Sequence, residues 1–230
     1  SNTDIRIRTN STERLRVTHA GNIGIGSASP GFPVVIYADA NRNSIAIRNA
    51  GSGTEEGRLY WYASDNTTIR AGISGQENGL VLFSGGATER LRITSGGGVH
   101  FTNGELIERV NITAGKLSDN TNIDLEDGMA HLFTTTETTT ATPNIRVNSS
   151  TTLNSVMATG DAISVTIITT AAAAGYSAQL TIDGVAVTEK WNGGSAPSAG
   201  GSSGNDYYTY NIIKTGDAAY TVLANVANFA

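Results

Sequence analysis

The stretch with the clearest potential for binding is a Gly- and Ser-rich segment over residues 192–206, which lies between Trp191 and the tyrosine-rich run 207–210. Loops of this length inside a compact strand pattern are usually functional or disordered. Aromatic rings beside neutral polar groups can stack on sugars while their neighbours hydrogen-bond the hydroxyls. The expected receptor or glycan contacts are Trp191, Asn192, Tyr207, Tyr208 and Tyr210. The alternative is that Trp191 and one or two tyrosines belong to the core, because aromatic residues in strands usually pack.

Acidic clusters are the candidates for acid–base chemistry. Their members are Glu55, Glu56, Glu105, Glu108, Asp124, Glu126 and Asp127. A glycosidase needs two carboxylates at a fixed distance across a cleft. Polar turns explain these clusters more simply, because charge clusters usually lie on solvated surfaces. The chain has no Cys and no His-x-His pair among its three His, so we expect no catalytic residues, no metal site, no cofactor and no enzymatic activity.

Charge is sparse along the chain, at 15% of the 230 residues against the usual quarter. The net charge of −5 and the pI near 5.2 argue against a nucleic-acid partner, which normally requires a basic surface. No apolar run approaches the roughly 20 residues that span a bilayer, so we expect no membrane insertion. The chain starts at Ser1-Asn2 without Met, and we expect it to be a fragment of a longer protein.

The elements that would position these residues are strands, and part of the chain is repeated. Residues 12–18, TERLRVT, return as residues 88–94, TERLRIT, at an offset of 76. The offset also pairs Ile5 with Val81, Ile7 with Phe83, Ile23 with Val99 and Ile25 with Phe101. Apolar and polar residues alternate within each run of the first copy, which predicts strands with one apolar face. One copy cannot bury that face alone, so we expect modules to stack or several chains to associate.

The sequence predicts an all-β fold, because short strand-like runs follow one another between turn residues. We expect repeat-built β modules over residues 1–101, with module boundaries near 12–30 and 88–101, followed by a connector over 102–127. Seven candidate strands in residues 128–230 predict a C-terminal, jelly-roll-like β-sandwich. Asp183-Gly184, between two alternating apolar runs, predicts a β-hairpin.

Residues 12–30, TERLRVTHAGNIGIGSASP, resemble the module boundary of bacteriophage tail-fibre and related virion proteins. That boundary reads Glu-Arg-Leu-Arg-Ile, two or three small residues, Gly-Asn-Val-Gly-Ile-Gly and a Ser/Thr-Pro. The resemblance implies that residues 1–101 are fibre-shaft modules. The second copy departs from the boundary pattern with GGGVHF over 96–101, so we expect the fibre shaft to end there. The C-terminal part is similar to the terminal domain of structural proteins from marine cyanobacterial phages. The stretches that carry this similarity are 152–157, 160–166, 190–197 and 207–215.

The resemblance implies a homotrimeric fibre of the virion whose terminal knob, residues 128–230, adheres to the host cell surface. The implied partners are a host-surface glycan or protein and other virion proteins. Trimerisation would bury the apolar stripe of the shaft strands against the sister chains. One alternative is a capsid- or neck-attached structural fibre without receptor contact. The other is a polysaccharide depolymerase, although such shafts normally show a long, regular β-helix with clustered acids.

Overall fold

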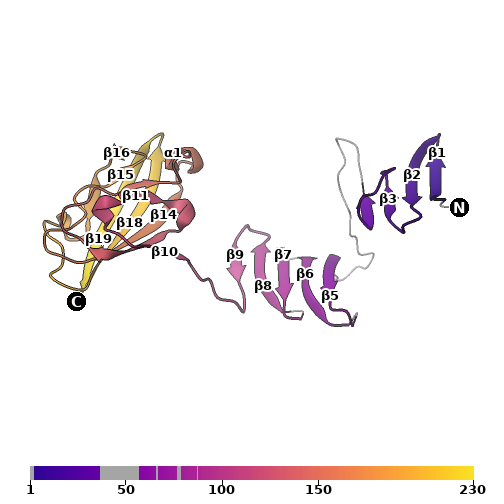
Figure 1. Cartoon of the computed structure of the whole chain (residues 1–230), viewed down its shortest axis with the longest axis horizontal. Coiled ribbons are helices and arrows are strands. Elements are labelled where there is room, and N and C mark those ends of the chain that lie inside the picture. Colours follow the sequence, from indigo (N-terminus) through magenta and orange to yellow (C-terminus); the bar gives the residue numbers. More distant parts are fainter. Residues whose placement is uncertain (1–2, 37–56, 66, 77–78, 87) are drawn as a thin grey trace. The chain divides into compact units, whose positions relative to one another are not determined.

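The structure is a computed structural model in which nearly all regular structure is β-strand, so the all-β prediction is confirmed. The described residues are 3–36, 57–65, 67–76, 79–86 and 88–230. The chain divides into two compact units, Ser1–Glu105 and Leu106–Ala230, and each unit is described by itself (Figure 1). The acidic pair Glu55-Glu56 lies outside the described residues.

The described residues of unit Ser1–Glu105 form two sheets. The first sheet comprises, in spatial order, β1 (Ile5–Thr9), β2 (Thr12–Val17), β3 (Ile23–Ile25) and β4 (Val34–Ile36). The first three strands are antiparallel, and β4 runs parallel to β3. β1 and β2 are joined at Asn10-Ser11, where both residues have the positive φ that a type I′ turn requires. This tight turn sets the pairs Thr9–Thr12 and Arg8–Glu13, and an extra residue at Arg14 then shifts the register so that Ile7 faces Leu15.

The first sheet carries two apolar rows that cross all four strands on one face. The rows are Ile5–Val17–Ile23–Val34 and Ile7–Leu15–Ile25–Ile36. Ile5 is 65% exposed and Val34 is 60% exposed, so no described residue covers this face. Charged side chains pair elsewhere on the sheet, where Arg16 lies 2.8 Å from Asp4 and 2.7 Å from Glu13. The alternating sequence therefore forms a sheet with one apolar and one charged face, as the period of two requires.

The second sheet is an antiparallel meander of five strands in chain order. Its strands are β5 (Gly57–Tyr62), β6 (Ile69–Gln76), β7 (Gly79–Ser84), β8 (Glu89–Thr94) and β9 (Val99–Phe101). One row, Leu59–Ile73–Leu82–Leu91–Phe101, crosses all five strands. Leu59 and Phe101 at its two ends are about half exposed. This sheet therefore also presents an uncovered apolar face.

The two repeat copies share a register downstream of the repeated motif but not upstream of it. Leu15 pairs with Ile25 as Leu91 pairs with Phe101. Upstream, however, Ile7 faces Leu15 whereas Leu82 faces Leu91, so the predicted match of Ile7 with Phe83 is wrong by one residue. The turn between β7 and β8 is one residue longer, and a slip of one residue moves every side chain to the opposite face. The same error applies to the match of Ile5 with Val81, because Val81 is buried on the other face.

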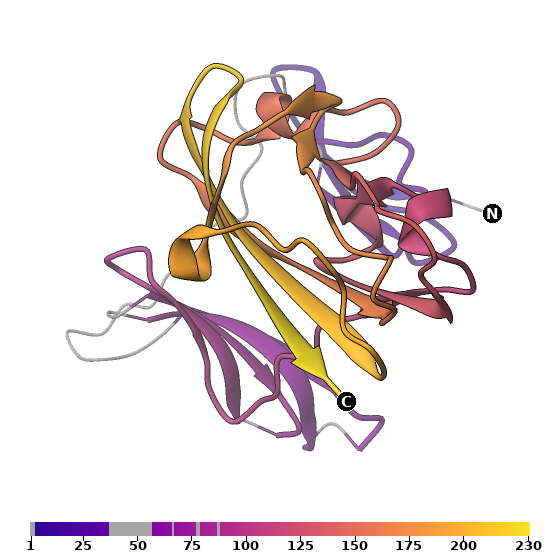
Figure 2. The same cartoon turned by 90° about the vertical axis from the view of Figure 1, so that its left-hand side faces the viewer.

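Unit Leu106–Ala230 has two sheets with mixed strand directions. The larger has the order β10 (Val110–Thr113), β12 (Ala130–Thr136), β14 (Ala162–Thr170), β18 (Asn205–Gly216), β19 (Ala219–Phe229) and β17 (Glu189–Trp191). The smaller has the order β11 (Asn122–Asp124), β13 (Asn144–Arg146), β15 (Thr181–Ile182) and β16 (Val185–Ala186). The long β18–β19 hairpin, orange to yellow in Figure 2, forms the C-terminal part of the larger sheet. The predicted hairpin at Asp183-Gly184 is confirmed, because it joins the antiparallel strands β15 and β16.

The first part of this unit is a parallel ladder that alternates between the two sheets. β10, β12 and β14 are parallel in the larger sheet, and β11, β13 and β15 are parallel in the smaller one. Side chains 22 residues apart bond along the ladder. These pairs are Asn144 to Asn122 at 2.9 Å, Arg146 to Asp124 at 2.5 Å and Asn148 to Glu126 at 2.8 Å. Two of the three acidic groups of the cluster at 124–127 are therefore bonded within the ladder.

The helices of this unit are short. They are the 3-10 helices η1 (Leu117–Asp119), η2 (Leu125–Asp127) and η3 (Asn192–Gly194) and the α-helix α1 (Leu153–Val156). The Thr152 side chain caps α1 by accepting a hydrogen bond from the Ser155 backbone N–H at 3.2 Å. Among the described residues there is no helix with the length and apolar character needed to cross a bilayer.

The two sheets of unit Leu106–Ala230 share one apolar core. The smaller sheet contributes Ile123, Ile145 and Ile182, and the larger contributes Phe133, Val165, Ile167, Tyr208, Tyr210, Ile212 and Val222. Fully burying side chains of this size stabilises the fold by about 1.5–3 kcal/mol each before entropy is counted. This core holds the larger sheet in place and leaves its other face to solvent.

Two boundary predictions for this region need correction. The expected connector over 102–127 is mostly part of the C-terminal unit, because it forms β10, η1, β11 and η2 and because Leu117 and Ile123 lie in the core. A jelly roll is built from antiparallel strands, whereas the ladder strands of this unit are parallel. The expected span 128–230 is therefore only part of a two-sheet unit that begins at Leu106.

Candidate functional site

The candidate site lies on the outer face of the larger sheet, which we define as the side chains that point away from the shared core. On β18 and β19 the core side takes the even-numbered residues, such as Tyr208 and Val222, so the odd-numbered residues form the outer face. Its residues on the four central strands are Ala130, Leu132, Thr134, Ser164, Thr166, Ile168, Tyr207, Thr209, Asn211, Ile213, Thr221, Leu223, Asn225, Ala227 and Phe229. None of these side chains is charged at neutral pH, so the outer face of the four central strands is neutral.

Tyr208 and Tyr210 are not part of this surface, and their predicted role as receptor contacts is corrected here. Both side chains are completely buried. The Ser177 backbone N–H donates to the Tyr208 hydroxyl at 3.3 Å, and the Ser177 and Tyr210 hydroxyls lie 2.8 Å apart. Burial raises the pKa of Tyr208 to about 12 and raises the pKa of Tyr210 further. Both tyrosines are thus core residues whose hydroxyl groups are satisfied inside the protein.

Trp191 lies at the border between the core and the site. On β17 it pairs with Ala224, which faces the core, and its ring meets the Tyr210 ring edge-to-face at 6.0 Å. The side chain is half-buried and packs against the core. Trp191 therefore fixes the edge strand β17 from the inner side, while its neighbours Lys190 and Asn192 are exposed.

Of the other predicted contacts, Tyr207 lies on the outer face of the larger sheet and Asn192 is exposed beside it. Tyr207 is half-buried on the outer face, and its ring meets the Phe229 ring edge-to-face at 5.9 Å. Asn192 is exposed, and its side-chain amide donates to the Asn225 side-chain oxygen at 3.2 Å. The two residues lie on opposite sides of β19, since Tyr207 on β18 pairs with Ala227 whereas Asn192 follows β17 and is bonded to Asn225.

A pocket of about 400 Å³ lies where β17, β19 and β18 meet, and we call it the amide pocket. Its lining residues are Lys190, Trp191, Asn192, Asn211, Leu223, Ala224 and Asn225. Three side-chain amides around an exposed leucine offer donors and acceptors beside an apolar surface. The Ser164 hydroxyl donates to the Asn211 side-chain oxygen at 2.7 Å, which orients that amide. This combination can hydrogen-bond the hydroxyl groups of a neutral sugar.

Asn211, Leu223 and Asn225 were not predicted from the sequence. The signal that could have identified them is their position in the alternation: Asn211 and Leu223 are odd-numbered residues between buried even-numbered neighbours, and Asn225 follows the buried Ala224 on the same face as Leu223. The pocket also depends on the parallel pairing of β17 with β19, which brings Lys190 opposite Leu223. Residues 190 and 223 are far apart in the chain, and no local pattern marks their pairing.

The Gly- and Ser-rich segment after η3 is held by a buried carboxylate. Asp206 is fully buried, and both of its oxygens lie 3.0 Å from the Gly201 backbone N–H that donates to them. The Asn228 side chain also donates to Asp206. Gly200 packs so closely against Gly175 and Ala172 that a Cβ atom would clash with their carbonyl oxygens. The segment is therefore anchored to the unit at its glycines.

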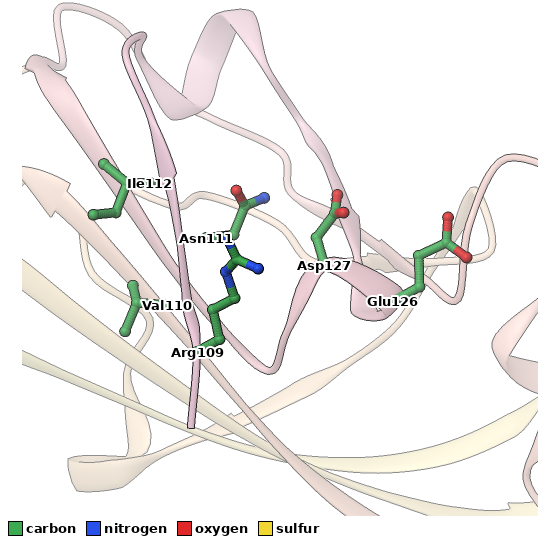
Figure 3. Close-up of a pocket in the computed structure, with 6 residues that line it drawn as sticks. All are labelled: Arg109, Val110, Asn111, Ile112, Glu126 and Asp127. Carbon is green, nitrogen blue, oxygen red and sulfur yellow. The ribbon is translucent and has the colours of Figure 1, made fainter. Parts of the chain in front are cut away.

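A second cavity, of about 580 Å³, lies beside β10 and η2 (Figure 3). Its lining residues are Arg109, Val110, Asn111, Ile112, Glu126 and Asp127. Behind it, the buried His131 donates from Nε2 to the Gly128 carbonyl at 2.9 Å, and its Nδ1 lies 3.4 Å from the Asn111 amide nitrogen. Burial lowers the pKa of His131. Within the described ranges, no three His, Asp or Glu side chains gather closely enough to hold a metal ion.

Comparison with known proteins finds no protein-family model and no curated protein that matches this chain.

Proposed function

We propose that the chain is a structural protein of a phage tail fibre, that its copies associate as a homotrimer and that the C-terminal unit adheres to the host cell surface. The observation that carries this proposal is the pair of uncovered apolar faces in unit Ser1–Glu105. In the first sheet, two rows of four aliphatic side chains cross every strand, and in the second sheet one apolar row crosses all five strands.

Such faces favour association of copies. Burial of apolar surface stabilises a protein by about 25 cal/mol per Å². A single-layer sheet does not gain this stabilisation on its exposed face. Three copies around an axis can turn the same face inward, so that each row packs against its counterparts on the other two chains. The charged face, with Arg16 paired to Asp4 and Glu13, then remains toward solvent.

The neutral outer face of the C-terminal unit supports the adhesive part of the proposal. Amide side chains at Asn192, Asn211 and Asn225 can bond the hydroxyl groups of a neutral glycan, and Lys190, the one charged residue that lines the pocket, can donate to them as well. Leu223, 44% exposed, offers an apolar contact in the same pocket. Ligand contact is thus proposed for the amide pocket, and Tyr208 and Tyr210 have a purely structural role.

Adsorption of the purified, fluorescently labelled chain to a panel of marine cyanobacterial strains tests this function. We expect strain-specific adsorption that Asn211→Ala weakens about tenfold, the equivalent of one lost hydrogen bond of about 1.4 kcal/mol. Asn122→Ala is the matched control, because Asn122 is also exposed and its side-chain oxygen also accepts one side-chain hydrogen bond, but on the smaller sheet. Equal loss in both variants would contradict the assignment of the pocket, and adsorption to no strain would contradict the adhesive function.

A further inference from the structure

Exposed apolar side chains of the C-terminal unit concentrate in one short stretch, residues 106–112, which we call the entry segment. Leu106 and Ile107 are 76% and 82% exposed, and Val110 and Ile112 are 39% and 65% exposed. The other large apolar side chains exposed among the described residues of this unit are Val156, Val185, Leu223 and Phe229. Half of the exposed large apolar residues of unit Leu106–Ala230 therefore lie within the seven positions of the entry segment.

The entry segment forms an open edge of the ladder. β10 is the terminal strand of the larger sheet and β11 the terminal strand of the smaller one, so neither has a described strand on its outer side. Figure 3 shows Val110 and Ile112 on one side of β10, with Arg109 and Asn111 on the other. Strand edges with exposed apolar residues are sites where another chain can pair or pack, and folded proteins usually cover them.

The surface beside this edge is suited to contact with a copy of itself. Ile112 pairs with Leu132, which pairs with Ile168, which pairs with Tyr207, so an apolar row runs from the edge into the outer face. In an assembly with rotational symmetry, residues near the axis meet their own copies, and like charges there would repel. The outer face of β12 and β14 carries no charged side chain, and the two charged residues of the entry segment, Glu108 and Arg109, have opposite signs, so Glu108 of one copy can lie beside Arg109 of another.

We propose that the entry segment and the adjoining apolar row contact the same region of a second copy of the chain. This inference rests on the proposed association of unit Ser1–Glu105, because Phe101 of its apolar face precedes Leu106 by only five residues. Five residues span at most about 18 Å. Copies that meet at Phe101 therefore hold their entry segments at an effective concentration of roughly the mM range, at which a small contact forms.

The contact also explains how the two ends of the larger sheet differ. β10 and β17 are its opposite terminal strands. Self-contact at β10 directs the β17 end, with the amide pocket, away from the contact and toward a ligand. The C-terminal units would thus be held together at one end of the sheet and remain open at the other.

Cysteine cross-linking in the full chain tests this contact, because the chain contains no Cys of its own. Ile112→Cys places a thiol at the proposed contact. Val185→Cys is the matched control, because Val185 is 66% exposed and lies on β16 of the smaller sheet. Each variant is treated with a short bismaleimide after light scattering has established its association state. We expect at least tenfold more linked chains from Ile112→Cys than from Val185→Cys.

The outcomes separate this contact from the association on which it rests. If the chains are associated but the two variants link equally, or neither links, the contact is wrong and the association stands. Monomeric chains would overturn both. Ile107→Cys serves as a second test of the same segment if Ile112→Cys fails to fold, and it too must link in preference to the control.

Discussion

Removing the Tyr210 hydroxyl distinguishes a core residue from a receptor contact, the two roles that the sequence left open. In Tyr210→Phe, the Ser177 hydroxyl loses a partner at 2.8 Å while remaining 1% exposed. A buried polar group left without its partner costs about 1–3 kcal/mol. The outer face is unchanged, because the Tyr210 side chain points into the core. We therefore expect lower stability of the C-terminal unit and unchanged adsorption to host cells.

A double-mutant cycle measures this hydrogen bond directly. Ser177→Ala orphans the Tyr210 hydroxyl and should cost a similar amount, whereas the double variant Ser177→Ala with Tyr210→Phe leaves neither group unpaired. We expect the double variant to be less destabilised than the sum of the two single variants, by roughly 1 kcal/mol. Urea unfolding followed by Trp191 fluorescence reports on this unit when the only other tryptophan, Trp61, is replaced by Phe.

Two observations on Tyr210→Phe would together place the Tyr210 hydroxyl at the ligand. If Tyr210→Phe leaves the urea midpoint unchanged and reduces adsorption, the hydroxyl acts on the ligand and not in the core. The buried position of Tyr210 and its bond to Ser177 would then not describe the state of the protein that binds.

Three further predictions follow from the C-terminal unit and the first sheet. Gly200→Ala should destabilise the C-terminal unit by about 1–3 kcal/mol in urea unfolding, because the added Cβ clashes with the carbonyl oxygens of Gly175 and Ala172. The control Gly216→Ala should destabilise the unit less, because its added Cβ meets only the Ala219 Cβ, at 3.6 Å. Because burial lowers the native pKa of His131, the unfolded chain takes up its proton first, so stability should fall as pH drops below about 6.5. His131→Gln should flatten that pH dependence, and an unchanged slope would contradict it. Ile7→Lys in the first sheet should shift the chain toward monomer in sedimentation velocity, whereas Arg8→Lys on the neighbouring exposed position should not.

The strands of the first sheet can be predicted because their signals, apolar alternation and turn residues, lie within short stretches of sequence. Apolar residues alternate, so the rows through Ile5 and Ile7 can be derived from periodicity, although the pairing of Ile7 with Leu15 also needs a bulge at Arg14 that the turn at Asn10-Ser11 does not supply. The same approach failed for Val81 and Phe83 because one extra residue in a turn changes the face without altering the apparent repeat. Register is set by turn geometry, which a fixed offset of 76 does not represent.

The C-terminal unit was predicted less well because its pairings are non-local. Parallel neighbours such as β11 and β13 are 22 residues apart and share no turn, so the bond from Arg146 to Asp124 leaves no local signal. The core side of β18 also carries Asp206 and Lys214, which obscure the alternation that would have marked Tyr208 and Tyr210 as buried. Asp206 is satisfied by Gly201 and Asn228, and Lys214 by backbone carbonyls, partners that only the folded chain supplies.

The central claim is that copies of this chain associate as a trimer through the apolar faces of unit Ser1–Glu105. Multi-angle light scattering of the full chain, coupled to size exclusion, measures this most directly. A trimer has a mass three times that of the 23.9 kDa chain, and we expect this mass to be maintained on dilution. A stable species with the mass of a single chain would contradict it.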